Sequence, residues 1–531
     1  MAFYKSTHRI EKERRIAAWT QLRDEAFEKL SCTHEDIAEL ERCVHGQIVL
    51  PDDATYNASR QQSNPAFQKY PCIIVYCETA GDVKCCLRFA YKFNLWVACR
   101  SGGHSTAGYS VNDGGMVIDT SRIQYVHVDR DAKLAHVGAG SSWGFVYAVV
   151  DSFGRHIPGG GCESVHIAGY MQGGGYSFTS REFGMNCDNV HEVKVMLADG
   201  RIVVANEEQN YPLYWAIRGG TGNNFGVLLE VTYALHDPGQ FWGFSILWEI
   251  DDAPAALFEM QNNYMKTGAS PKLGFQTIGT SQGPPQNKRQ VLLMRGMYNG
   301  TEEEGREAIR SMLQTPGAQL QYGFSGSYNE LNSYLLEQPE PIPSLPTGAK
   351  EDKQSGYIRA PLSLVEWQGV IAFFKTSPNL YSTFDLEAYG GAINAYPLGG
   401  NAFIHRDAYC DFFLDVFWVQ DDERAQVVQY LDDFMAMMQP YFDRPDGRPQ
   451  ANQDYPRATQ TNYLELYFDG FIRDIITVKR LYDPNNFFHY QQSIPLEYPP
   501  DVEINPASPG FTGEEEIVYE SYSSSIAEAA A

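Results

Sequence analysis

Two glycine-rich stretches decide the fold of this chain: Arg100-Ser-Gly-Gly-His-Ser105, and Gly159-Gly-Gly-Cys-Glu-Ser-Val165 with Gly173-Gly-Gly175 close behind it. Each places one reactive side chain, His104 or Cys162, inside a run of glycines. Glycine permits positive φ and lets another group approach the backbone closely. Successive backbone N–H groups in such turns form concave surfaces that bind phosphate. The two stretches together therefore predict a site for a large planar ligand with a pyrophosphate, and we interpret this ligand as a flavin held between them.

Each of these features also has an ordinary structural explanation. A single histidine in a turn is usually a hydrogen-bonded structural residue, and a single cysteine is usually a small buried hydrophobe. Turns use glycine for their own geometry. The interpretation therefore depends on finding both motifs in the same chain.

The bulk composition describes an acidic globular protein of 531 residues, and this length predicts two domains or slightly more. The hydrophobic fraction is 43% and the charged fraction 20%, which is typical of a soluble globular chain. The formal net charge is −25 and no basic patch dominates the sequence. Nucleic acid and anionic membranes are therefore poor candidate partners, and a neutral or cationic small-molecule substrate is favoured.

Targeting signals and cysteine spacing give expectations about the cellular compartment, metal sites and disulfides. No apolar run is long enough for a membrane helix, and the charged N-terminus lacks the apolar core of a signal peptide. We therefore expect a cytoplasmic protein unless a leader has been removed. The ten cysteines form no CxxC pair, so no metal site is predicted. An odd number remains once Cys162 is set aside, which argues against a fully paired extracellular disulfide framework.

The patterns along the chain predict an α+β fold with several segments. Short strands alternate with helices at 80–93 and 142–153, and the two glycine-rich stretches lie between these elements. Near residue 238 the composition shifts to aromatic strands alternating with polar helices, which indicates a second domain built on an antiparallel sheet. Residues 510–531 are polar and acidic, and we expect a poorly ordered tail there. The predicted segments are an N-terminal helical extension (1–45), a ligand-binding domain (46–238), a second domain (239–456), a closing segment (457–497) and a tail (498–531).

Several motifs stand in an order that resembles the berberine-bridge-enzyme-like branch of the vanillyl-alcohol-oxidase superfamily. Besides the two glycine-rich stretches, they are Asp188-Asn-Val190, Trp215-Ala-Ile-Arg-Gly-Gly220, Asn224-Phe-Gly-Val227, and a closing motif Lys479-Arg-Leu-Tyr-Asp-Pro-Asn-Asn-Phe-Phe488 with Gln492-Ser-Ile494. The resemblance covers residues 46–494, and its pattern is nearest to carbohydrate (oligosaccharide) oxidases with a bicovalent flavin. It implies a two-part FAD-binding domain of residues 46–238 and 457–497, with the α+β substrate domain inserted between the parts.

The resemblance also implies the cofactor and its contacts. FAD would be bonded covalently to His104 and Cys162. The small Val165, three residues after the cysteine, favours oxygen as electron acceptor, whereas His166 stands where the family usually has glycine. The other implied cofactor-binding residues are Arg100, Ser101, Gly102, Gly103, Ser105, Gly108, Gly161, Gly169, Gly173, Gly174, Gly175, Asp188, Val227 and Gln492.

Hydride transfer from an alcohol needs a base that takes the hydroxyl proton. Asn462-Tyr463 resembles the family's element whose tyrosine faces the flavin, so Tyr463 is the implied base. Glu387 stands where carbohydrate oxidases carry a carboxylate, and it would be the partner of the base and a substrate ligand. Gln420 matches a polar position that faces substrate and would donate a hydrogen bond.

The leading hypothesis is oxidation of a sugar or oligosaccharide at its C1–OH to a lactone, with oxygen reduced to hydrogen peroxide, by a monomer or small homo-oligomer. A first alternative is a flavin oxidase or dehydrogenase that acts on an alcohol, amine or phenol in natural-product biosynthesis. An alternative of another class is a protein that holds FAD without significant turnover. An NAD or P-loop enzyme is not indicated, because the chain has no GxxxxGK[ST] and no well-placed GxGxxG.

Overall fold

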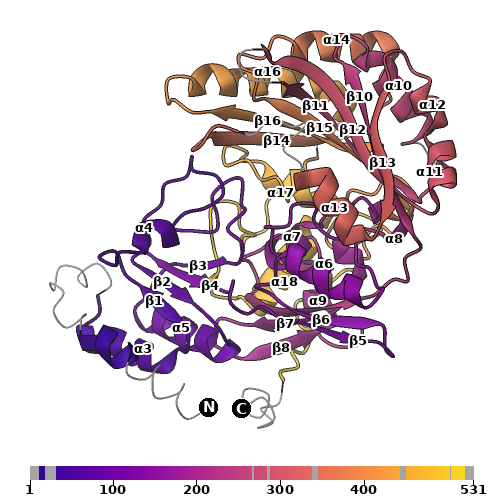
Figure 1. Cartoon of the computed structure of the whole chain (residues 1–531). Coiled ribbons are helices and arrows are strands. Elements are labelled where there is room, and N and C mark those ends of the chain that lie inside the picture. The colour runs from indigo at the N-terminus through magenta and orange to yellow at the C-terminus, as the bar shows by residue number, and fades with distance from the viewer. Residues whose placement is uncertain are drawn as a thin grey trace.

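The computed structural model describes residues 11–17, 31–265, 268–283, 287–337, 345–442, 450–500, 502 and 504–520. Three sheets organise this part of the chain, with strand orders β1-β2-β4-β3, β5-β6-β9-β7-β8 and β13-β10-β12-β11-β15-β16-β14. Figure 1 shows the two smaller sheets in the lower half of the molecule and the large sheet above them. The predicted α+β class is confirmed.

The first sheet positions the His104 stretch. Strands β2 and β3 both pair in parallel with β4, and β1 pairs antiparallel with β2. Helix α5 begins after Thr79, whose side chain accepts a hydrogen bond from the backbone of Asp82 and so satisfies a free N–H of the first turn. The strands are β1 (Gln47–Val49), β2 (Ile73–Tyr76), β3 (Val97–Arg100) and β4 (Met116–Asp119), with helices α3 (His34–Cys43), α4 (Tyr56–Ser59) and α5 (Ala80–Lys92).

A disulfide joins Cys43 at the end of α3 to Cys85 in α5. The other eight cysteines of the chain form no disulfide. The odd number of cysteines argued only against a fully paired framework, and the sequence analysis did not predict this single bond. It ties α3 directly to α5, the crossover helix of the first sheet.

The second sheet is wholly antiparallel and positions the Cys162 stretch. Its helices α6 and α7 are joined by that loop. The strands are β5 (Val126–Asp129), β6 (Leu134–Gly138), β7 (Val190–Met196), β8 (Ile202–Ala205) and β9 (Val227–Ala234), with α6 (Trp143–Ser152), α7 (Ile167–Gly173), α8 (Ser180–Phe183), η1 (Asn186–Asn189) and α9 (Tyr211–Ile217).

The third sheet has seven antiparallel strands, and alternate residues of each strand face opposite sides. Phe384, Leu386 and Ala388 of β15 belong to an aromatic-rich core, whereas Asp385 and Glu387 face the other way. Figure 1 shows α10, α14 and α16 on the side of the sheet away from the smaller sheets. The strands are β10 (Phe241–Glu249), β11 (Leu273–Gln282), β12 (Arg289–Asn299), β13 (Gln319–Gly326), β14 (Lys350–Ile358), β15 (Thr383–Ala388) and β16 (Cys410–Trp418), and the helices are α10 (Ala253–Asn263), α11 (Glu302–Ala308), α12 (Arg310–Leu313), α13 (Tyr328–Glu337), α14 (Leu364–Phe374), α15 (Ala392–Ala395) and α16 (Arg424–Phe442).

The end of the chain returns to the smaller sheets. Helices α17 (Tyr463–Phe468), η3 (Asp469–Phe471) and α18 (Ile472–Tyr482) share one buried core with the second sheet. Tyr519 forms an isolated bridge with Val203, and Asn210 donates to the Val518 carbonyl at 2.8 Å. The expectation of a poorly ordered tail from 510 is therefore wrong as far as 520, and residues 521–531 lie outside the described part.

At the N-terminus the structure describes a helix over residues 11–17, followed after a gap by α3. The remainder of the predicted N-terminal helices lies outside the described residues. Within the described ranges, we find no helix with the length and apolar character that crossing a membrane requires.

Candidate active site

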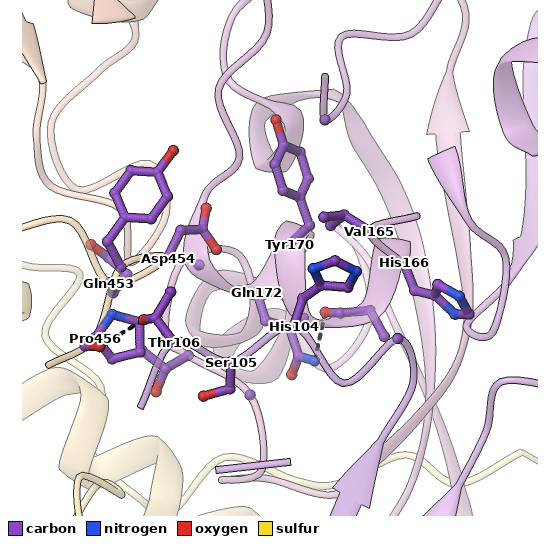
Figure 2. A pocket seen from close by; sticks show the side chains of 18 of the residues that line it. His104, Ser105, Thr106, Val165, His166, Tyr170, Gln172, Gln453, Asp454 and Pro456 are labelled. Carbon is purple, nitrogen blue, oxygen red and sulfur yellow. Dashed lines mark hydrogen bonds between the residues drawn. The ribbon is translucent and has the colours of Figure 1, made fainter. Parts of the chain in front are cut away.

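The candidate site is a cavity of about 580 Å³ where the three sheets and the C-terminal segment meet. Both glycine-rich stretches line it, as do β11, β12, β14, β15 and β16 of the large sheet. The segment Asn452–Pro456 closes one side. Figure 2 shows His104 and Val165 of the glycine-rich stretches and Tyr170 of α7, with Gln453, Asp454 and Pro456 of that segment.

The His104 loop begins where β3 ends. The Arg100 guanidinium pairs with Asp119 at the end of the neighbouring strand β4 and donates to the Ser59 carbonyl at 2.7 Å. Gly103 has φ +72°, a conformation that favours glycine, and its carbonyl accepts from the Ser63 backbone at 3.0 Å. Burial lowers the pKa of His104, so its imidazole is neutral at neutral pH.

The Cys162 loop is held from both sides. Its turn closes with a bond from the Val165 N–H to the Cys162 carbonyl at 3.2 Å, and the Trp143 N–H donates to the Val165 carbonyl at 2.9 Å. From the large-sheet domain, the Asn332 side chain donates to the Gly161 carbonyl at 2.8 Å. These contacts hold the loop so that Cys162 lines the cavity and the nearby Ser164 hydroxyl lies 3.1 Å from His104 Nε2.

His166 packs against the first glycine-rich stretch. Its Nδ1 lies 3.1 Å from the Ser101 hydroxyl, which also donates to the Ala139 carbonyl at 2.9 Å. A Cβ added to Gly102 would lie 2.8 Å from the His166 ring, so the histidine occupies the space that glycine leaves. Burial lowers the pKa of His166 as well. The departure from the family's glycine is therefore accommodated by its contact with the other loop.

The cavity's glycines fit a flavin dinucleotide. A Cβ added to Gly169, which lines the cavity, would meet no protein atom within 4 Å and so would extend into the space left for a ligand. A Cβ on Gly173 would lie 2.0 Å from the Asp454 carboxyl, so the two walls approach closely there. The volume is in the range of cofactor sites. Gly169 therefore leaves space for a ligand inside the cavity, and Gly173 allows the Asp454 segment to pack closely against α7.

The wall formed by the large sheet carries paired carboxyl groups. Glu387 Oε1 accepts from the Gln276 side chain at 2.8 Å and from the Tyr455 hydroxyl at 3.2 Å, while Oε2 is buried with no hydrogen-bond partner in the protein. Burial raises the pKa of Glu387 to about 7 and that of Asp385 to about 6. Glu387 therefore changes its protonation state near neutral pH.

Tyr455 is the tyrosine that the structure brings to this carboxylate. Its segment is anchored by Asn452, which donates to Asp411 at 2.6 Å, and by Asp454, which accepts from the Gly175 N–H at 2.9 Å. The Lys353 ammonium lies 4.6 Å from the centre of the Tyr455 ring. Burial, with the nearby carboxyl groups, raises the pKa of Tyr455 well above its usual value. The sequence analysis missed this residue.

Most of the predicted cofactor-binding residues line the cavity. They are Arg100, Ser101, Gly102, Gly103, His104, Ser105, Gly161, Cys162, Val165, Gly169, Gly173, Val227 and Gln492. Gly108, Gly174 and Gly175 do not line it. They adopt positive φ of 71°, 118° and 78°, and they shape the turns that carry their neighbours.

Asp188 is not among the cavity-lining residues either. It forms a buried ion pair with Arg406 at 2.6 Å and accepts from the Asn401 side chain at 2.8 Å. A carboxylate beside a guanidinium in a buried site has a structural role, because removing either partner leaves an uncompensated charge. This residue joins η1 to the segment after β15.

The structure places two of the predicted catalytic residues away from the cavity. Tyr463 begins α17 and donates its hydroxyl to the Ser493 carbonyl at 2.8 Å, and it does not line the cavity. Gln420 is exposed in the turn after β16, where its backbone N–H donates to Glu423 at 2.9 Å. Of the three predicted catalytic residues, only Glu387 lies at the cavity.

Two parts of the chain match known protein families. Residues 71–206 match the family described as FAD binding domain, and residues 452–495 match the family described as berberine and berberine like. The second match contains Tyr455 and the closing motif.

Three relatives cover most of the chain. An uncharacterized FAD-linked oxidoreductase, YgaK, of Bacillus subtilis is 27% identical over 85% of this chain and 97% of its own length. A carbohydrate oxidase of Microdochium nivale is 25% identical over 84% of this chain and 92% of its own. The solved structure of Physcomitrella patens BBE-like 1 is 26% identical, covers 86% of this chain and 99% of its own, and superposes with a TM-score of 0.77. The predicted resemblance is confirmed, and the chain is an FAD-linked oxidoreductase.

Proposed function

We propose that this FAD-linked oxidoreductase of the berberine bridge enzyme family oxidises the C1–OH of a sugar or oligosaccharide to a lactone, with oxygen as the electron acceptor. The observation that carries the proposal is the hydrogen bond from Tyr455 to Glu387 at 3.2 Å on the cavity wall opposite the glycine-rich loops. It supplies a proton acceptor where an alcohol would bind.

The glycine-rich loops would hold FAD. His104 and Cys162 stand at one end of the cavity, and we propose that both are bonded covalently to the cofactor. When bound, FAD would accept hydride from the alcohol carbon and pass two electrons to oxygen, which with two protons gives hydrogen peroxide. The small side chain of Val165 would leave room for oxygen beside the ring.

The hydroxyl proton of the substrate would leave through two residues. A tyrosine with a raised pKa is a neutral phenol at neutral pH, so it can take a proton only if it gives its own away. Glu387 Oε1 accepts the Tyr455 hydroxyl and has a pKa of about 7. Tyr455 therefore takes the substrate proton while its own proton passes to the Glu387 carboxylate.

The substrate side of the cavity favours a polyhydroxylated molecule. Gln276, Arg295 and Asp385 line it together with Lys353 and Glu387. Amide, guanidinium and carboxyl groups of this kind recognise hydroxyl groups by hydrogen bonding. The sequence relative named as a carbohydrate oxidase supports the same substrate class.

A panel of substrates under air tests the proposal. The purified protein is assayed for hydrogen peroxide with mono- and oligosaccharides, and in parallel with alkyl alcohols, amines and phenols. We expect peroxide with one or more sugars, and its formation from the same sugars to be about 10²- to 10⁴-fold slower after Glu387→Gln. Turnover confined to amines, phenols or non-sugar alcohols would contradict the substrate class, and turnover only with an artificial dye would contradict oxygen as acceptor.

A further inference from the structure

Ser164 connects the two proposed attachment residues. Its hydroxyl lies 3.3 Å from the Cys162 sulfur and 3.1 Å from Nε2 of His104. The three side chains therefore form a continuous chain of donors and acceptors from a thiol to an imidazole. Neither the glycine-rich motif nor the family resemblance assigned a role to this serine.

The backbone fixes Ser164 in this position. It lies in the turn closed by the Val165 N–H on the Cys162 carbonyl, and the preceding Glu163 carbonyl accepts from the Gly144 N–H at 3.1 Å. The Glu163 side chain accepts a hydrogen bond from Ser333 of α13. Because the turn is anchored at helix α6 and at helix α13, the serine's contacts with both reactive groups follow from the fold.

We propose that Ser164 is a positioning residue for flavin attachment, which relays the Cys162 thiol proton to Nε2 of His104. This inference rests on the proposed covalent attachment. The thiolate is the reactive form of cysteine, so forming a bond to sulfur requires that the thiol proton leave. Replacing a ring hydrogen of the cofactor by sulfur releases two protons and two electrons in total, and oxygen, the proposed acceptor, would take them up as hydrogen peroxide. In the relay, Cys162 gives its proton to the Ser164 oxygen and Ser164 gives its own to Nε2, so the serine is unchanged and charge is conserved.

The state of His104 suits this role. Burial lowers its pKa, so the neutral ring has a lone pair available for a proton. The hydrogen bond made by one ring nitrogen decides which nitrogen remains available for other chemistry. A neutral imidazole has one lone pair, so the relay follows the bond at His104. Once Nδ1 is bonded to the cofactor, Nε2 holds the remaining lone pair, and it lies 3.1 Å from the Ser164 hydroxyl.

The test compares covalent flavin in full-length wild type, Ser164→Ala and Ser164→Thr. Each protein is precipitated with acid, and intact mass and tryptic peptide mapping give the occupancy of each bond at a fixed time after synthesis. We expect Ser164→Ala to keep the bond at His104 and to form the Cys162 bond about 100-fold more slowly, as for loss of a proton-transfer group. Ser164→Thr retains the hydroxyl, and we expect both bonds in it.

A matched control removes a different hydroxyl that contacts the same loop from helix α13. Ser333→Ala deletes the contact with Glu163 and touches neither Cys162 nor His104. We expect both bonds in this variant. If Ser333→Ala loses the Cys162 bond as Ser164→Ala does, loop order and not the relay explains the loss, and the inference is overturned.

Two further outcomes separate this inference from the proposed function. Ser164→Ala with both bonds at wild-type occupancy overturns the inference and leaves covalent attachment in place. Wild type without any covalent flavin overturns the attachment itself, and the relay with it. Because the Ser164 side chain is exposed, we expect its alanine variant to keep the wild-type circular dichroism spectrum.

Discussion

Replacing Tyr455 with phenylalanine is expected to slow reduction of the bound flavin by substrate by about 10²- to 10⁴-fold, without loss of flavin. The variant keeps the ring, with its contacts to Phe413 and the Lys353 ammonium, and deletes only the hydroxyl that bonds to Glu387. The rate of flavin bleaching after anaerobic mixing with saturating sugar measures the effect.

Tyr463→Phe is the matched control. Its hydroxyl bonds to the Ser493 carbonyl outside the cavity, so we expect a reduction rate within about twofold of wild type, as for most substitutions away from a site. If flavin reduction were slow in Tyr463→Phe and near the wild-type rate in Tyr455→Phe, Tyr463 would be the base, as the sequence analysis predicted.

The second large effect is expected for Glu387→Gln. In wild type, the rate of flavin reduction should rise with pH to a plateau above about pH 7, because the Glu387 carboxylate must be ionised to accept the Tyr455 proton and its pKa is about 7. Glutamine cannot accept this proton. We expect a rate loss of about 10²- to 10⁴-fold at pH 8 and no step near pH 7.

The sign of the stability change provides an independent check on this variant. Burial raises the folded-state pKa of Glu387, so the residue stabilises the fold at low pH and this contribution is lost as pH rises through about 7. Glu387→Gln should therefore not lower the melting temperature at pH 8. If the wild-type rate of flavin reduction did not change between pH 5 and pH 9, the assigned role of Glu387 would be contradicted.

The parts of the site that depend on local sequence were predictable. The two glycine-rich stretches follow or precede short strands and helices, and their reactive residues His104 and Cys162 both line the cavity. The shift in composition near residue 238 coincides with the start of the large sheet at Phe241. Such features follow from glycine geometry and from hydrophobic patterns within a few residues.

The residues that were missed depend on tertiary contacts. Tyr455 and Tyr463 are eight residues apart, and only the start of α17 decides that Tyr463 turns toward Ser493 while Tyr455 reaches Glu387. Asp188 forms an ion pair with Arg406, which lies 218 residues further along the sequence. Motif order carries no information about which of two nearby side chains faces the cavity, or about a partner so distant in the chain.

The measurement that tests the central claim most directly is the intact mass and absorption spectrum of the acid-precipitated wild-type protein, with His104→Ala and Cys162→Ala made singly and together. We predict that the precipitated wild type carries the added mass of one FAD and keeps its flavin absorbance. Each single variant should retain the flavin through the remaining bond, and the double variant should release it. Flavin that leaves the wild-type protein with the acid supernatant would contradict covalent attachment at His104 and Cys162.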